Sequence, residues 1–88
     1  MNFKELNEKL GGELKRSEWF QGSGGGWVQI TAHVENKANI RENAIVFGNA
    51  LVCGDALVSG DARVFGNAQV FGNARVSGNS RISGSVLH

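Results

Sequence analysis

The sequence has no proline and no tyrosine, and its 88 residues include a single cysteine and two histidines. The lone Cys53 excludes an intrachain disulfide and a multi-cysteine metal site, and such cysteine usage is typical of a reducing compartment. Charge of either sign is in little excess, because nine Lys plus Arg against eight Asp plus Glu give a formal net charge of +1. This balance argues against nucleic acid as a partner.

Long hydrophobic runs are also absent, so no stretch of the sequence is long enough to span a bilayer. We therefore expect no membrane among the partners of the protein. No apolar run follows Met1 to Glu5, so we expect no signal peptide and a soluble, cytoplasmic protein. A chain of 88 residues allows one small domain and excludes a catalytic domain joined to a separate binding domain.

Glycine is abundant, with thirteen residues, and from Gly48 to Gly84 it recurs every six positions. The hexads read GNALVC, GDALVS, GDARVF, GNAQVF, GNARVS and GNSRIS, and the same frame continues upstream through ENAIVF, NKANIR and ITAHVE. A period of six is a multiple of two and matches no helical period. The small residue and the branched residue two positions later therefore lie on one face of a short strand. Tight Gly-Asn or Gly-Asp corners between such strands favour a solenoid over hairpins.

The frame also predicts the core. The branched positions hold Val28, Val34, Ile40, Val46, Val52, Val58, Val64, Val70, Val76 and Ile82. The small positions hold Ala32, Ala38, Ala44, Ala50, Ala56, Ala62, Ala68, Ala74 and Ser80.

This repeat, over residues 27–88, resembles the hexapeptide repeat of left-handed parallel β-helices. The resemblance implies an all-β fold, a left-handed parallel β-helix of about three triangular coils of about eighteen residues each. The hexad sequence pattern G-[ND]-A-x-V-x, preceded by GGGWV, also resembles the repeats of small hexapeptide-repeat proteins encoded by phages and prophages. That resemblance implies a protein acting in the cytoplasm of a bacterial host cell.

Residues eighteen apart would stack in such coils, and the outward positions would form three flat faces. The face with Phe47 over Phe65 is richer in apolar side chains than solvent exposure favours, and exposed apolar patches of this kind mark interfaces. We therefore predict a homo-oligomer, and the resemblance implies a homotrimer. The predicted interface residues, for self-association or for a partner, are Trp27, Ile45, Phe47, Arg63, Phe65, Arg81, Leu51 and Phe71.

Residues 1–26 lie outside the repeat. Asn2 and Glu5 have the spacing of a capping box at the start of a short amphipathic helix that ends at Gly11-Gly12. The glycine-rich stretch 21–26 predicts a flexible joint. This segment either caps the open N-terminal end of the solenoid or docks another protein. The apolar residues expected to do so are Phe3, Leu6, Leu10, Trp19 and Phe20.

Many enzymes with the fold that the resemblance implies are acyltransferases, which use a histidine base in a cleft between subunits. Here His88 is the last residue, and His33 occupies an outward position that is more typical of a surface histidine. No loop interrupts the hexads between Ile30 and Ser83 to build a pocket wall. Cys53 has no base nearby in the repeat and is expected to be a packed thiol. We predict no catalytic, cofactor-binding or metal-binding residues.

The sequence thus favours a non-enzymatic, oligomeric interaction module whose partners are itself and a host protein. The phage resemblance implies an inhibitor of a bacterial defence complex, such as a CRISPR-Cas complex, or an accessory virion protein. The alternative is an acyltransferase-like or small-ligand-binding oligomer that uses His33 in a subunit cleft.

Overall fold

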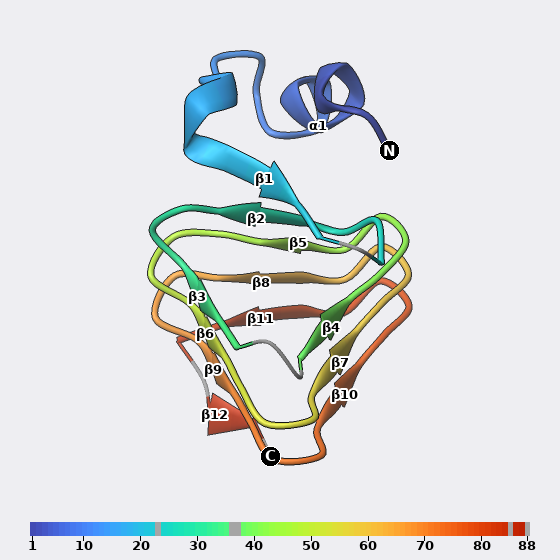
Figure 1. Ribbon diagram of the computed structural model, residues 1–88, viewed down its shortest axis with the longest axis vertical. Coiled ribbons are helices and arrows are strands. Elements are labelled where there is room, and N and C mark those ends of the chain that lie inside the picture. Colours follow the sequence, from blue (N-terminus) through green and yellow to red (C-terminus); the bar gives the residue numbers. More distant parts are fainter. Residues whose placement is uncertain (23, 36–37, 85, 88) are drawn as a thin grey trace.

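The hexads form two- and three-residue strands that wind into a three-turn parallel β-solenoid in the computed structural model (Figure 1). The structure describes residues 1–22, 24–35, 38–84 and 86–87. Their elements are α1 Phe3–Lys9, the 3-10 helix η1 Arg16–Glu18, β1 Trp19–Gln21, β2 Trp27–Gln29, β3 His33–Val34, β4 Asn39–Ile40, β5 Ile45–Val46, β6 Leu51–Val52, β7 Leu57–Val58, β8 Arg63–Phe65, β9 Gln69–Val70, β10 Arg75–Val76, β11 Arg81–Ser83 and β12 Val86–Leu87.

Successive coils pair strand on strand, which gives three flat sheets. Their strand orders are β1-β2-β5-β8-β11, β10-β7-β4 and β12-β9-β6-β3. Within the solenoid every pairing is parallel, and Val28 faces Val46, which in turn faces Val64, so the register is eighteen residues. The predicted coil length and the parallel solenoid are confirmed. The last pairing differs, because Val86 of β12 faces Gln69 of β9. The offset between these two strands is seventeen residues, one fewer than in the other pairings.

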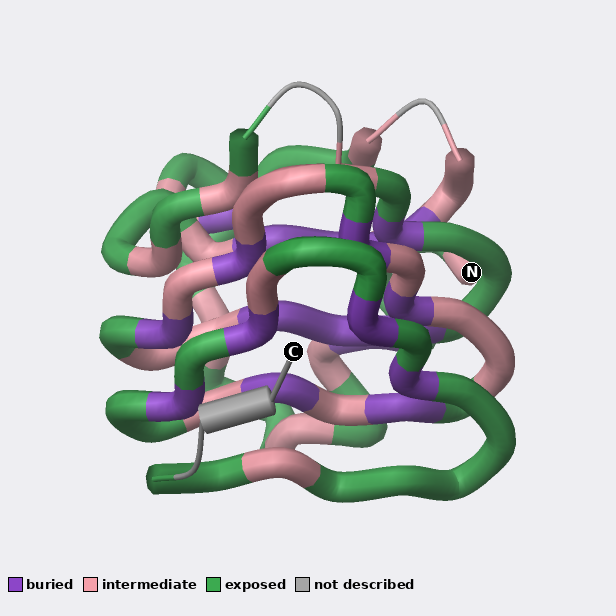
Figure 2. Tube along the Cα trace, turned by 90° about the horizontal axis from the view of Figure 1, so that it is seen from below, coloured by how far each residue is buried: buried purple, intermediate pink, exposed green. Residues whose placement is uncertain are grey.

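The core is the stack of inward side chains that the repeat predicted, except that Ser80 is exposed. Ala44, Val46, Val52, Val58 and the later members of both series down to Val76 are buried in one cluster. Val34 and Ile82, which lie in the first and last coils, are partly buried against it. Buried segments recur in each coil while the corners are half-buried or exposed (Figure 2). Burying a branched side chain contributes about 1.5 to 3 kcal/mol, so the repeat is itself the main source of apolar stabilisation.

The corners depend on glycine for two reasons. From Gly48 to Gly84 the corner glycines have φ between 62° and 71°, a conformation that side chains disfavour. The coils also approach closely there, because a Cβ on Gly54 would lie 2.9 Å from the backbone N and O of Gly72. Glu42 occupies the equivalent corner of the first coil with φ 57°.

The N-terminal segment adds a helix and one strand to the first coil. The capping box is confirmed, since the Asn2 side chain accepts from the Glu5 N–H and the Glu5 carboxylate accepts from the Asn2 N–H. Strand β1 pairs antiparallel with β2, and the Gly26 N–H donates to the Ile40 carbonyl. These contacts cover backbone edges of the first coil that would otherwise be unpaired.

The glycine-rich stretch contains several hydrogen bonds among its described residues. The Gly22 N–H donates to the Gly26 carbonyl at 2.9 Å, and the Gly25 N–H donates to the Gly22 carbonyl at 3.0 Å. The Gln21 side-chain amide adds a hydrogen bond to the Gly25 carbonyl at 2.9 Å. This stretch is therefore a hydrogen-bonded turn in its described residues, and Ser23 lies outside them.

Candidate interaction surface

The outward side of the sheet β1-β2-β5-β8-β11 gathers most of the predicted interface residues, and we call it the aromatic face. Six of the eight lie on it, in two columns set by the eighteen-residue register. The first column runs Trp27, Ile45, Arg63 and Arg81, and the second contains Phe47 and Phe65. Leu51 lies on β6 of the neighbouring sheet β12-β9-β6-β3 and Phe71 directly follows β9 of that sheet, so neither joins the aromatic face.

The upper half of the aromatic face is covered by the chain itself. Trp27 and Ile45 are 2% and 1% exposed, because they form a buried cluster with Leu6 of α1 and Trp19 of β1. The expectation that these two side chains are open to a partner is therefore wrong. The physical reason is that the apolar stripe of α1 is stabilised by burial against an apolar surface. Trp27 and Ile45, at the start of the first column, form that surface next to α1.

The same contacts assign a place to the N-terminal residues. Phe3, Leu6, Leu10 and Trp19 all pack in or against this cluster, so α1 lies on the outer side of a sheet and not across the open end of the solenoid (Figure 1). Phe20 differs, because it alternates with Trp19 along β1 and is 47% exposed.

Arg16 contacts both the N-terminal segment and the aromatic face. Its guanidinium lies over the rings of Trp27 and Phe3, at 5.3 and 5.6 Å from their centroids. It also donates a 2.8 Å hydrogen bond to the Trp19 carbonyl. The Trp27 indole N–H in turn donates to the Met1 carbonyl at 2.8 Å. The role of Arg16 was missed from the sequence, because it depends on which outward ring α1 covers.

A row of three aromatic rings crosses from the covered half to the open half. Phe47 and Phe65 are stacked with centroids 5.1 Å apart and planes 8° apart, as predicted. Trp19 lies on the other side of Phe47, 6.2 Å away at 44°. Phe47 and Phe65 are each half-buried. The buried Trp19 indole N–H has no hydrogen-bond partner among the residues that the structure describes.

The lower half of the aromatic face consists of Arg63, Phe65, Arg81 and Ser83. Arg63 and Phe65 on β8 face Arg81 and Ser83 on β11 across the parallel ladder. Arg63 is half-buried and Arg81 is exposed. The described residues supply neither arginine with an ion pair or a side-chain hydrogen bond.

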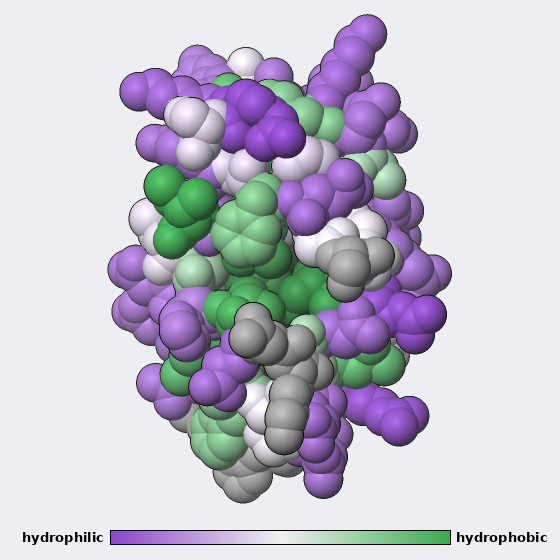
Figure 3. All heavy atoms as spheres, viewed as in Figure 1, coloured by the Kyte–Doolittle hydropathy of each residue, from purple (hydrophilic) through white to green (hydrophobic). Residues whose placement is uncertain are grey.

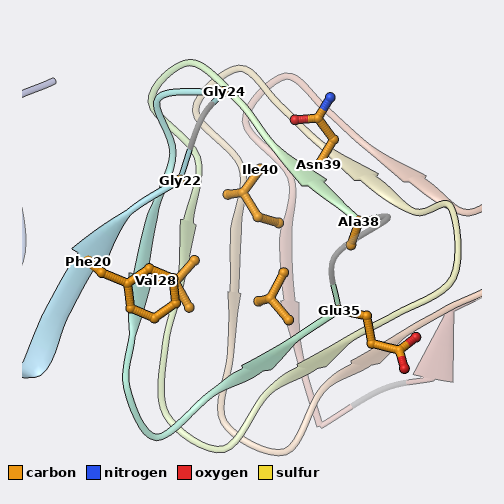
Figure 4. A pocket seen from close by; sticks show the side chains of 9 residues that line it. Phe20, Gly22, Gly24, Val28, Glu35, Ala38, Asn39 and Ile40 are labelled. Carbon is orange, nitrogen blue, oxygen red and sulfur yellow. The ribbon is translucent and has the colours of Figure 1, made fainter.

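A second feature is a hollow of about 170 Å³ at the N-terminal end of the solenoid, where the first coil exposes its core. Hydrophobic residues gather in the middle of the face that Figure 3 shows, which is seen from the same side as in Figure 1. Val28 and Ile40 point into the hollow and Phe20 lies at its edge (Figure 4). It is lined by Phe20, Gly22, Gly24, Val28, Val34, Glu35, Ala38, Asn39 and Ile40. The segment 1–26 thus leaves this end partly open.

His33 and Cys53, which were considered for chemistry, lie apart from both features. His33 is exposed on β3 and does not line the hollow, and His88 lies outside the described residues. Cys53 is a half-buried free thiol. In the described part of the chain, no three His, Cys, Asp or Glu side chains are grouped to hold a metal ion. None of the described helices has the length and hydrophobicity that crossing a membrane requires.

Comparison with known proteins identifies the repeat. A family model described as the YdcK beta solenoid repeat matches residues 56–70 and 68–84, which run from β7 to the end of β11. No curated protein and no solved structure matches the chain. The matched segments cover less than half of the sequence and agree with the observed solenoid. The chain is a β-solenoid repeat protein whose later coils are similar to the YdcK repeat family.

Proposed function

We propose that this protein is a non-enzymatic, oligomeric interaction module, which associates with itself and binds a host protein through the aromatic face. The observation that carries the proposal is the stack of Phe47 on Phe65, which continues the buried N-terminal cluster into the open half of the face. Half-buried aromatic rings on a flat surface are the anchors that protein interfaces favour.

The covered half of the same face supports the proposal. There the outward side chains Trp27 and Ile45 bury the apolar stripe of α1, with Leu6 fully enclosed. The aromatic face therefore already binds an amphipathic helix within the chain. Helix-in-groove docking of this kind is a common way for proteins to recognise one another. Self-association would extend this burial from the covered half to the exposed part of Phe47, and it would leave Arg63 and Arg81 open to a partner.

The role in a bacterial host cell is proposed from the sequence pattern of the hexads. Their similarity to small hexapeptide-repeat proteins of phages and prophages supports a role in an infected bacterial cell. The protein would be an inhibitor of a host defence complex, such as a CRISPR-Cas complex, or an accessory virion protein. As a homotrimer it would present the same binding surface in several copies, which raises the avidity for a multi-subunit target.

Affinity capture from bacterial lysate tests the module, with variants that separate the aromatic face from His33. Phe65→Asp should lose a stoichiometric host protein that the wild type retains, because it places a charge in the aromatic stack. Ser77→Asp is the matched control, since it adds the same charge at an exposed position after β10. His33→Ala should bind like the wild type.

A plating assay tests the defence role. Expression of the wild type should protect a phage or plasmid against a defence system of the host, and Phe65→Asp should not. No protection against any defence system, together with no captured host protein, would refute the proposed inhibitor. Loss of binding in His33→Ala alone would favour the subunit-cleft alternative instead.

A further inference from the structure

Charge is separated along the solenoid although the whole chain is nearly neutral. Residues 45–62 carry Asp55 and Asp61 and no basic residue, which gives −2. Residues 63–84 carry Arg63, Arg75 and Arg81 and no acidic residue, which gives +3. The C-terminal part of the solenoid is therefore cationic, and two of its three arginines lie on the aromatic face.

The arrangement of these two arginines is unfavourable for the isolated chain. Arg63 and Arg81 are directly opposite each other in the parallel ladder of β8 and β11. Like charges at such positions destabilise a sheet. The described residues provide neither side chain with a carboxylate within ion-pair distance. An external anion that bridges the pair would remove this repulsion.

The geometry of the aromatic rings beside the two arginines indicates which kind of anion would bind between them. The rings of Phe47 and Phe65 are nearly parallel in their stack, and Trp19 lies on the other side of Phe47. One face of the Phe47 ring is therefore covered by Phe65, and Trp19 lies beside the ring at a tilt of 44°. Side chains stand roughly perpendicular to a sheet, so the rings turn their edges outward. Ring edges carry the positive end of the aromatic quadrupole and favour carboxylates and apolar side chains.

This arrangement disfavours single-stranded nucleic acid. Strand-binding proteins stack successive bases on the open faces of successive aromatic rings. Here the stack leaves at most the outer face of Phe65 for a base, because its other face is covered by Phe47. Planar guanidinium groups beside ring edges are better matched to the carboxylates of a protein.

We propose that the lower half of the aromatic face, formed by Arg63, Phe65 and Arg81, docks an acidic segment of a partner protein. One carboxylate is held by the arginine pair, and an apolar side chain of the segment packs against Phe65. The inference rests on the proposed function and deepens it, because it states the chemistry of the partner. Charge complementarity of this kind makes the affinity depend on salt.

Fluorescence anisotropy with defined probes tests the inference on the full chain. The probes are a labelled peptide of alternating Glu and Leu, its Gln and Leu counterpart, and an oligothymidylate of similar charge. The Glu peptide should bind at low salt and weaken as salt is added, and the Gln peptide should not bind. Arg81→Glu should weaken binding by about tenfold or more, since it removes one charge-assisted contact and adds a repulsion.

Arg75→Glu is the matched control, because Arg75 is an exposed arginine six residues before Arg81 and lies on a different sheet. It makes the same change in net charge and should leave the affinity within about twofold of the wild type. Equal losses in Arg75→Glu and Arg81→Glu would overturn the inference, because they would show attraction to net charge alone. Binding of oligothymidylate as tight as that of the Glu peptide would also overturn it.

The test separates this inference from the proposed function. If Phe65→Asp abolishes assembly or capture while Arg81→Glu and added salt change nothing, the acidic partner is wrong and the interaction module stands. If Phe65→Asp leaves both assembly and capture intact, the interaction module itself is wrong.

Discussion

The close stacking of corner glycines makes a quantitative prediction about stability. We compare Gly54→Ala with Gly78→Ala, because the two glycines have similar φ values of 71° and 64°. A Cβ on Gly54 would lie 2.9 Å from both N and O of Gly72, whereas a Cβ on Gly78 would meet nothing within 4 Å. The pair therefore separates the cost of backbone conformation from the cost of crowding between coils.

The expected magnitudes follow from these two costs. An alanine in the left-handed region costs about 1 to 2 kcal/mol, which both variants lose. Crowding in a packed interior adds about 1 to 3 kcal/mol, and only Gly54→Ala incurs it, because backbone atoms of Gly72 must move. Gly78→Ala should thus lower the free energy of unfolding by about 1 to 2 kcal/mol. The loss for Gly54→Ala should be about 2 to 5 kcal/mol.

Urea unfolding followed by circular dichroism measures this difference, with all variants at one protein concentration because association affects apparent stability. If the two variants lose the same free energy, the second and third coils do not approach at this corner as the structure has them. A larger loss in Gly78→Ala than in Gly54→Ala would refute the reasoning outright.

Two further substitutions test the core and the covered half of the aromatic face. Val58→Ala should lower the unfolding free energy by about 2 to 3 kcal/mol in urea titrations, because Val58 is fully buried, whereas the larger but outward Leu57→Ala should cost about 1 kcal/mol. The reverse order would contradict the inward register. Leu6→Ala should cost about 2 to 5 kcal/mol and shift tryptophan emission to the red, because Trp27 loses its cover. The exposed Glu8→Ala is its control, and identical spectra for the two variants would show that α1 does not cover Trp27.

Most of the solenoid could be predicted because the same pattern of small and branched residues recurs in every hexad. Val46 and its equivalents must face inward in every coil for the small and branched positions to be buried together. Phe47 over Phe65 followed from the coil length alone. What the repeat could not show is where a non-repeating segment packs. Trp27 and Ile45 were expected to be open, and α1 covers them instead.

Side-chain contacts at the corners were also beyond the pattern. Carboxylate or amide oxygens of the first coil accept hydrogen bonds from corner glycine N–H groups of the second coil. The pairs are Gln29 with Gly48, Glu35 with Gly54 and Glu42 with Gly60, at 2.8, 3.1 and 3.1 Å. No spacing rule indicates them, because each depends on a long side chain reaching across the gap between two coils.

The mass of the protein in solution tests the central claim most directly. Light scattering at micromolar concentration should show the wild type as a homo-oligomer, with the mass of a trimer, because self-association buries the exposed part of Phe47 and leaves Arg63 and Arg81 open to a partner. Phe65→Asp should shift the mass toward that of one chain, and Ser77→Asp should not. A wild type with the mass of one chain would contradict the account.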